Sequence, residues 1–164
     1  MSQKADIMIR RAERAEITTL AGLTRRAYQP WVAVLGREPL PMQADFAAAF
    51  DAHRFDVLCE GNVVRALLET ELRGDPVHGG SLWIENIAVD PSAQGNGFGG
   101  ALLMYAEQLA REQGRRRLTL YTNKRMAKNI AIYSARGYVI DKEEVSALGT
   151  VVHMSKTLTQ TRRP

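Results

Sequence analysis

The segment that decides the fold is LWIENIAVDPSAQGNGFGGALL, residues 82–103. Its first eight residues are nearly all apolar, which predicts a strand covered on both faces of a sheet. Four glycines fall within positions 95–100, and apolar residues at helical spacing follow them directly. Because glycine adopts positive φ without strain, successive backbone N–H groups of such a loop can turn toward one anion. The first turn of the following helix adds unpaired N–H groups and partial positive charge, so the segment predicts a pyrophosphate site.

The glycine spacing fits two kinds of pyrophosphate ligand. Gly95, Gly97 and Gly100 satisfy the G-x-G-x-x-G pattern of dinucleotide-binding folds. Gln94, Gly97 and Gly99 satisfy the Q/R-x-x-G-x-G/A pattern of acyl-CoA binding. The glycines by themselves leave both ligands open.

The residues around the glycines favour acyl-CoA. A dinucleotide-binding loop needs its first glycine at the end of the strand, and an acidic residue about 20 positions later at the end of the next strand. Here residues 90–94 separate the strand from the glycines, and the next predicted strand ends in Tyr-Thr-Asn-Lys at 121–124, without a carboxylate. A Walker loop is excluded because no Gly-Lys-Ser/Thr sequence follows the glycines.

The rest of the chain predicts a mixture of strands and helices. We expect strands where apolar residues alternate or run together, and helices where they recur every three to four residues. The Gly61-Asn62 pair indicates a hairpin turn. The predicted strands are residues 6–11, 56–60, 63–70, 82–89, 118–122, 138–143 and 150–158, and the predicted helices are 13–28, 42–50, 99–113 and 126–136. The order β-α-α-β-β-β-α-β-α-β-β predicts an α/β (α+β mixed) protein with helices on the faces of a mixed sheet.

Two segments resemble a known family. Residues 82–103 closely resemble motif A of the GCN5-related N-acetyltransferases: a central strand, a short Asp-Pro loop, the Q/R-x-x-G-x-G/A turn and a helix. Residues 129–138, NIAIYSARGY, resemble motif B, with an Asn four residues before a Tyr and then Gly-aromatic. The resemblance covers residues 57–139 well and the first 50 residues only in outline. IENIAV, QGNGFG and N-x-x-x-Y-x-x-x-G-Y are similar to segments of glucosamine-6-phosphate N-acetyltransferases, in parts that the superfamily shares.

The resemblance implies a fold, a cosubstrate and a reaction. The implied fold is a mostly antiparallel, twisted sheet of about seven strands with about four flanking helices, in one domain over residues 1–159. The implied cosubstrate is acetyl-CoA, whose thioester is attacked directly by a primary amine of a small molecule in a ternary complex. Acetylation of a peptide or protein amine is one alternative, and a non-catalytic acyl-CoA-binding sensor module is another. The cofactor-binding residues implied are Ile87, Ala88, Val89, Gln94, Gly95, Asn96, Gly97, Phe98, Gly99, Gly100 and Asn129.

Tyr133 and Glu85 are the predicted catalytic residues. Tyr133 lies one helical turn from Asn129, and a phenol with an ordinary pKa near about 10 can return a proton to the departing thiolate. The alternative for Tyr133 is a core residue of a short helix. Glu85 shares a strand face with Ile87 and Val89, and a carboxylate inside an apolar strand is costly to bury. We therefore expect Glu85 to act as general base through water, with a substrate-binding or structural role left open, while the Ile87 N–H polarises the thioester carbonyl.

The acceptor site is the least determined part. By resemblance, the first two helices and their connection wall it, here with Tyr28, Trp31, Met42 and Asp45. Aromatic side chains there would cover an apolar or ring-bearing amine, and Asp45 would attract an ammonium group. The alternative, equally open, is that these apolar and aromatic side chains only pack the helices together and that Asp45 is simply an exposed carboxylate. Trp83 points to the same side of its strand as the predicted base, and it either lines the cleft or fills the core.

Composition restricts the other function classes. The 164 residues suit one globular domain, and no apolar run is long enough for a membrane span. One cysteine excludes an internal disulfide, and three scattered histidines predict no metal site. The basic residues at 115–117, 124, 125 and 128 are either a solvated helix end and loop or neighbours of a small phosphorylated ligand, which explains their clustering better than nucleic acid does. The charged N-terminus predicts a cytoplasmic protein, residues 160–164 predict a disordered tail, and a homodimer is left open.

Overall fold

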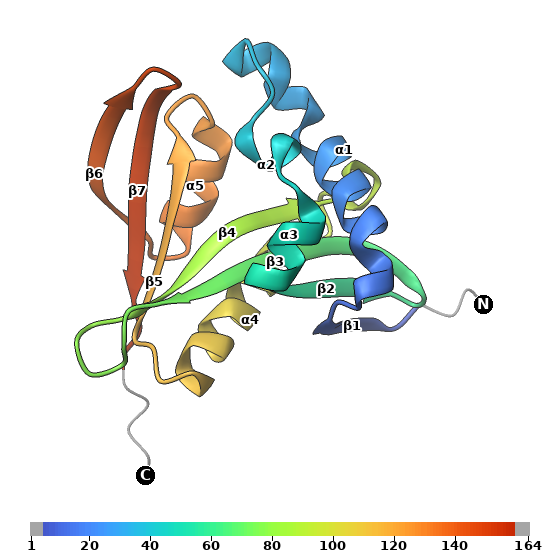
Figure 1. Cartoon of the computed structure of the whole chain (residues 1–164), viewed down its shortest axis with the longest axis horizontal. Helices are drawn as coiled ribbons and strands as arrows, with labels where there is room; N and C mark the ends of the chain where they lie inside the picture. Colours follow the sequence, from blue (N-terminus) through green and yellow to red (C-terminus); the bar gives the residue numbers. More distant parts are fainter. Residues whose placement is uncertain (1–4, 160–164) are drawn as a thin grey trace. The chain divides into compact units, whose positions relative to one another are not determined.

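The computed structural model describes residues 5–159, whose helices and strands are shown in Figure 1. The strands follow the order β1-β2-β3-β4-β5-β7-β6 in one seven-stranded sheet. The chain divides into a first unit, Met1–Thr70 with Asn86–Met104, and a second unit, Glu71–Glu85 with Tyr105–Pro164. Three elements contribute residues to both units: β3 (Val63–Arg73), β4 (Ser81–Val89) and α4 (Phe98–Glu112). The predicted disordered tail, residues 160–164, lies outside the described residues.

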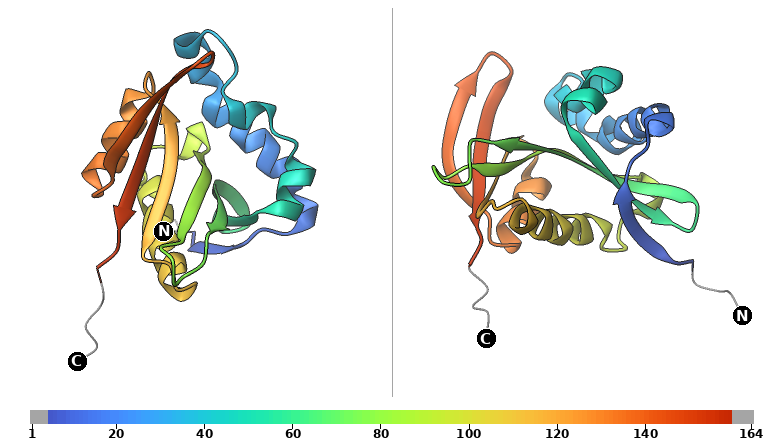
Figure 2. Two further views of the ribbon diagram at one scale, coloured as in Figure 1. Left: turned by 60° about the vertical axis from the view of Figure 1, so that its left-hand side comes forward. Right: turned by 60° about the horizontal axis from the view of Figure 1, so that its bottom comes forward.

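The first unit packs helices against antiparallel strands. β1 (Ile7–Arg11) pairs with β2 (Arg54–Glu60), and β2 pairs with β3 across the Gly61-Asn62 turn, which confirms the predicted hairpin. α1 (Ile17–Leu35), α2 (Leu40–Gln43) and α3 (Phe46–Ala52) connect β1 to β2, and Figure 2 shows α1 and α3 on the same side of these strands. The buried core of this unit consists of Leu20, Leu23, Phe46, Phe55, Val57, Cys59, Leu67 and Ala88.

The first helix extends beyond its predicted end. The sequence predicts a helix over residues 13–28, but a 3₁₀ turn, η1 (Arg14–Glu16), comes first and α1 then continues through Pro30. An interior proline removes one N–H donor from the helix without ending this one. α1 ends at Gly36, which adopts the left-handed conformation (φ 71°) and donates to Val32 O at 2.9 Å. The glycine, and not the proline, therefore sets the end of the helix.

The second predicted helix, residues 42–50, is two helices. Ala44 has extended backbone, which separates α2 from α3. Asp45 then caps α3, because its carboxylate accepts from the Ala48 N–H at 3.1 Å. The described residues consequently hold five α-helices where the sequence predicts about four.

The second unit contains the C-terminal strands. β5 (Arg117–Asn123) pairs antiparallel with β7 (Gly149–Thr157), which forms an antiparallel hairpin with β6 (Val139–Ser146). β4 and β5 pair in parallel, Leu82 with Leu118 and Trp83 with Thr119. α5 (Ala127–Ala135) connects β5 to β6.

The mixed, mostly antiparallel seven-stranded sheet with flanking helices confirms the predicted fold class. The predicted order of elements along the chain is also found, except that three α-helices instead of two lie between β1 and β2. No helix within residues 5–159 is both long enough and apolar enough to cross a membrane. The assignment of residues 1–159 to a single domain stays a prediction.

Candidate active site

The glycine loop follows β4 where the sequence predicts it. β4 ends at Val89, and the 3₁₀ turn η2 (Pro91–Ala93) separates it from the glycines. Gly95 and Gly97 have φ of 84° and 76°, in the left-handed region that other residues rarely adopt. A Cβ at either position would meet no atom within 4 Å. These glycines are therefore required by the backbone conformation and not by a lack of space.

The loop and the first turn of α4 present a row of backbone donors. Among residues 5–159, the backbone N–H groups of residues 95–100 find no hydrogen-bond acceptor, whereas the next N–H, that of Ala101, donates to Gly97 O at 3.0 Å. The side chains point elsewhere: Asn96 Nδ2 donates to Ala93 O at 2.9 Å, and Phe98 is buried. Because the helix N-terminus also carries partial positive charge, the backbone alone can bind an anion such as a pyrophosphate.

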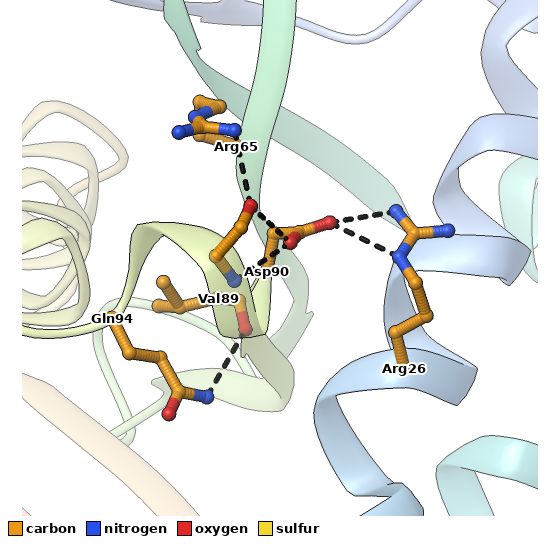
Figure 3. Close-up of polar contacts among 6 residues, drawn as sticks. Arg26, Arg65, Val89, Asp90 and Gln94 are labelled. Carbon is orange, nitrogen blue, oxygen red and sulfur yellow. Dashed lines mark hydrogen bonds and ion pairs between the residues drawn. The ribbon is translucent and has the colours of Figure 1, made fainter.

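A polar network holds the residues between β4 and the glycines (Figure 3). Arg26 of α1 donates to Asp90 Oδ2 from Nε at 3.1 Å and from Nη2 at 2.7 Å. Asp90 Oδ1 accepts from the Ser92 hydroxyl at 2.7 Å and from the Ser92 N–H at 3.0 Å. Arg65 of β3, whose role the sequence does not indicate, donates from Nη1 to the Ser92 hydroxyl at 3.2 Å. The Ser92 hydroxyl and Arg26 lower the pKa of Asp90 to about 2, so the network contains a carboxylate at neutral pH.

The backbone of β4 has one side free of β3. Directly after β4, the Asp90 N–H donates to Arg65 O of β3 at 2.8 Å. Because backbone groups alternate sides along a strand, the N–H groups of Ile87 and Val89 point away from β3. The Gln94 side chain bends back on this side, where Nε2 lies 3.4 Å from Val89 O. This is the side from which an extended ligand could bond β4.

Tyr28, a predicted acceptor residue, serves the packing of α1 on β4. Its hydroxyl donates to Asn86 Oδ1 at 2.9 Å and lies 3.3 Å from Ile87 O. Asn86, which is buried, also donates from Nδ2 to Thr24 Oγ1 of α1 at 3.3 Å. Sequence reasoning missed Asn86 and Thr24, although a buried amide within the apolar run 82–89 requires hydrogen-bond partners.

The other predicted acceptor residues of the first unit are spread over its three helices. Trp31 is half-buried on α1, and Met42 is buried on α2. Asp45 is exposed, but one of its carboxylate oxygens accepts from the Ala48 N–H. Helix capping is thus sufficient to explain Asp45.

Glu85 lies in the second unit on β4 and is exposed. The argument that this carboxylate is buried at a cost is wrong, because its strand face is open at this position. Trp83 is 6% exposed, and its Nε1 donates to Glu85 Oε2 at 2.6 Å. The structure therefore brings together two of the predicted site residues, with the indole acting as a hydrogen-bond donor to the carboxylate.

Tyr121 joins this pair and was not among the predicted residues. Its ring centroid lies 5.1 Å from that of Trp83 and 6.1 Å from that of His153 on β7. The side chain is 40% exposed, and burial of the rest, together with the charge of Glu85, raises its pKa. The alternation in β5 is the signal that could have found it, because Leu118 and Leu120 are buried while Tyr121 lies on the opposite face.

Asn129 and Tyr133 lie one turn apart on α5, as the spacing predicts, and both are half-buried. The Tyr133 ring lies 5.7 Å from that of Tyr138. Burial raises the pKa of Tyr133 to about 12, so the assumption of an ordinary phenol is wrong. Tyr133 stays protonated at neutral pH, but it is a weaker proton donor than the sequence alone implies.

Several basic side chains that follow α4 bind partners within the second unit. Arg115 is buried and donates to Gly74 O at 2.8 Å, which is a structural role. Arg117 pairs with Asp141 at 3.3 Å, and Lys124 pairs with Glu143 at 2.8 Å. The inference of a phosphorylated ligand from this charge is therefore not needed. Within residues 5–159, no group of three or more His, Cys, Asp and Glu side chains could hold a metal ion.

Comparisons with known proteins agree with the two sequence motifs. The family model described as "Acetyltransferase (GNAT) family" matches residues 20–138. No curated protein matches the sequence. The fold is similar to that of the ribosomal-protein-S18-alanine N-acetyltransferase from Escherichia coli, with a TM-score of 0.70 and 18% identity over 95% of this chain and 96% of that chain.

Two further structures share the fold. A spermidine N-acetyltransferase chimera from Vibrio cholerae and hSSAT has a TM-score of 0.73 and 19% identity over 92% of this chain and 95% of that one. The Salmonella typhimurium protein yncA, solved with its cofactor acetyl-CoA, has a TM-score of 0.70 and 19% identity over 98% of both chains. At such identities the likeness is one of fold.

Proposed function

Because the chain belongs to the acetyltransferase (GNAT) family, we propose that it transfers the acetyl group of acetyl-CoA to a primary amine of a small molecule. The observation that carries the proposal is the row of unpaired backbone N–H groups at residues 95–100, held by Gly95 and Gly97 at positive φ. Such a row fits the pyrophosphate of coenzyme A. The similar fold of a protein solved with acetyl-CoA supports the same cosubstrate.

The pantetheine arm would bond the backbone of β4. The N–H groups of Ile87 and Val89 point away from β3, so they are available to bond an extended ligand. Asn129 would bond a pantetheine amide, and Gln94 offers amide donors near the phosphates. Most of these contacts to the cofactor would come from the backbone. The side chains of Asn96 and Phe98 instead contact the protein, since Asn96 donates to Ala93 O and Phe98 is buried.

The reaction is a direct displacement. The acceptor ammonium loses a proton to Glu85, directly or through water, and its nitrogen lone pair attacks the thioester carbon while the Ile87 N–H stabilises the oxyanion. The C–S bond breaks, and the thiolate takes a proton from Tyr133. With the pKa of Tyr133 raised to about 12, this transfer is favourable only if the departing sulfur is desolvated as well, which raises the basicity of the thiolate in the same way. The second proton of the attacking nitrogen passes to the resulting tyrosinate, directly or through water, which leaves a neutral amide and restores Tyr133, and the proton on Glu85 returns to solvent.

A screen of amines identifies the class of acceptor. Purified protein, acetyl-CoA and single amines are mixed, and free thiol and the acetylated product are measured. We expect release with small primary amines. Acetylation of peptide amines alone would replace the small-molecule assignment, and acetyl-CoA binding without thiol release for any amine would replace the enzyme by a binding module. The fold itself serves both acceptor classes, since its neighbours include a spermidine and a ribosomal-protein acetyltransferase.

A further inference from the structure

The Trp83–Glu85 pair lies on the face of the second unit's sheet opposite to α4. On β7, Lys156 contacts Glu107 of α4. Because side chains alternate along a strand, the buried Val152 and Met154 lie on the same face of the sheet as Lys156, toward α4. His153 therefore points to the opposite face. Its ring neighbours Tyr121, whose ring neighbours Trp83, which places all three aromatic side chains on the face that α4 does not cover.

Trp83 is held in place by contacts from three strands. The Arg73 guanidinium of β3 lies over its ring, with Cζ 3.8 Å from the centroid. Tyr121 of β5 packs against it at 5.1 Å with an interplanar angle of 48°. Within β4, the indole N–H donates to Glu85 at 2.6 Å. The indole is thus a buried, fixed donor beside an exposed carboxylate.

Glu85 gains a defined orientation from this donor. An exposed glutamate has several staggered rotamers of similar energy. A hydrogen bond to its ionised carboxylate is roughly twice as strong as one between neutral groups, which favours the rotamer seen here. Oε2 is occupied by the indole, whereas Oε1 has no donor among residues 5–159. The carboxylate therefore has one fixed oxygen and one available oxygen.

We propose that Trp83 is a positioning residue of the acetyl transfer: its indole N–H fixes Glu85 so that Oε1 is the oxygen that accepts the proton of the acceptor ammonium. The inference rests on the proposed function, since Glu85 is the base of that reaction. In this role Trp83 acts through the carboxylate and not on a substrate.

The hydrogen bond is tested without any activity by NMR. The chain has two tryptophans, Trp31 and Trp83, and so two indole N–H resonances, which Trp31→Phe assigns. In Glu85→Gln, which leaves Trp83 in place, we expect the Trp83 resonance to move upfield as a charged acceptor becomes neutral, while the Trp31 resonance stays fixed. An unmoved Trp83 resonance would overturn the proposal.

The catalytic role is tested by a double-mutant cycle. Trp83→Phe keeps a ring and removes the donor, so kcat should fall about 10-fold as Glu85 spreads over several rotamers, with KM within about twofold. In the Glu85→Gln background the same change should leave kcat unaltered, because the residue through which Trp83 acts is gone. An equal fall in both backgrounds means a merely structural role and overturns the inference. Absence of transfer by the wild type with every amine instead overturns the proposed function, and the NMR shift distinguishes the two failures.

Discussion

The variant Gly97→Ala tests whether coenzyme A binding needs the left-handed backbone conformation of Gly97, separately from any steric clash. Gly97 has φ 76° and a Cβ there would meet no atom within 4 Å, so the variant suffers conformational strain without a clash. A non-glycine residue in the left-handed region costs about 1–2 kcal/mol. Gly36, at the end of α1, has φ 71° and the same open surroundings, which makes Gly36→Ala a control matched in both respects.

The same backbone strain should lower the unfolding free energy in Gly36→Ala but the affinity for coenzyme A in Gly97→Ala. Gly36 donates to Val32 O, so the helix end keeps its conformation and Gly36→Ala should lose about 1–2 kcal/mol of unfolding free energy in urea. The N–H of Gly97 has no partner among residues 5–159, so the free loop of Gly97→Ala can relax to negative φ with little loss of stability. Binding must then restore the strained loop, and the affinity for coenzyme A should fall about 5- to 30-fold by calorimetry.

The outcomes that refute this reasoning are specific. Wild-type affinity for coenzyme A together with wild-type stability in Gly97→Ala would mean that positive φ at this residue is not needed. A loss of coenzyme A affinity in Gly36→Ala would mean that the effect is general and not a property of the loop.

Three further results are expected. Asp90, whose pKa is lowered from 3.8 to about 2, stabilises the fold fully above pH 3.8 and loses this contribution as the pH falls through about 2. Asp90→Asn should therefore cost about 2 kcal/mol in urea unfolding at pH 7 and only about 0.4 kcal/mol at pH 2, and a cost that does not change with pH would contradict it. Tyr133→Phe should lower kcat about 100-fold, and wild-type turnover by the variant would remove Tyr133 from the mechanism. Because burial raises the pKa of Tyr133 to about 12, kcat of the wild type should not fall on the alkaline side through ionisation of this group up to about pH 10. Glu85→Gln should flatten the acidic limb of the pH–rate profile, and a surviving limb would point to another base.

Local signals predicted the central segment well. The apolar run to Val89, the residues that separate it from the glycines, and Gly95 and Gly97 at positive φ all appear as the sequence implies. These features depend on backbone preferences within a few residues, which composition and spacing record directly. For the same reason Asn129 and Tyr133 fall on one helix, one turn apart.

Helix ends and contacts between distant segments were missed. The end of α1 depends on the left-handed Gly36 rather than on Pro30, and the break at Ala44 depends on the Asp45 cap. The exposure of Glu85 depends on which sheet face is uncovered, which a single strand does not reveal. Arg65 donates from Nε to Glu60 at 3.1 Å within the β2–β3 hairpin and from Nη1 to a Ser92 hydroxyl that is distant in sequence, and only the first contact is local. The cytoplasmic location and the homodimer stay predictions.

Every role proposed here for a side chain depends on acetyl transfer itself. The most direct test is to incubate the purified chain with acetyl-CoA and a panel of small primary amines, and to quantify free thiol and acetylated amine together by mass spectrometry. We predict equal amounts of the two products with at least one small amine, and no acetylated protein when the amine is omitted. Tight binding of acetyl-CoA with no thiol released for any amine, small or peptide, would contradict the account.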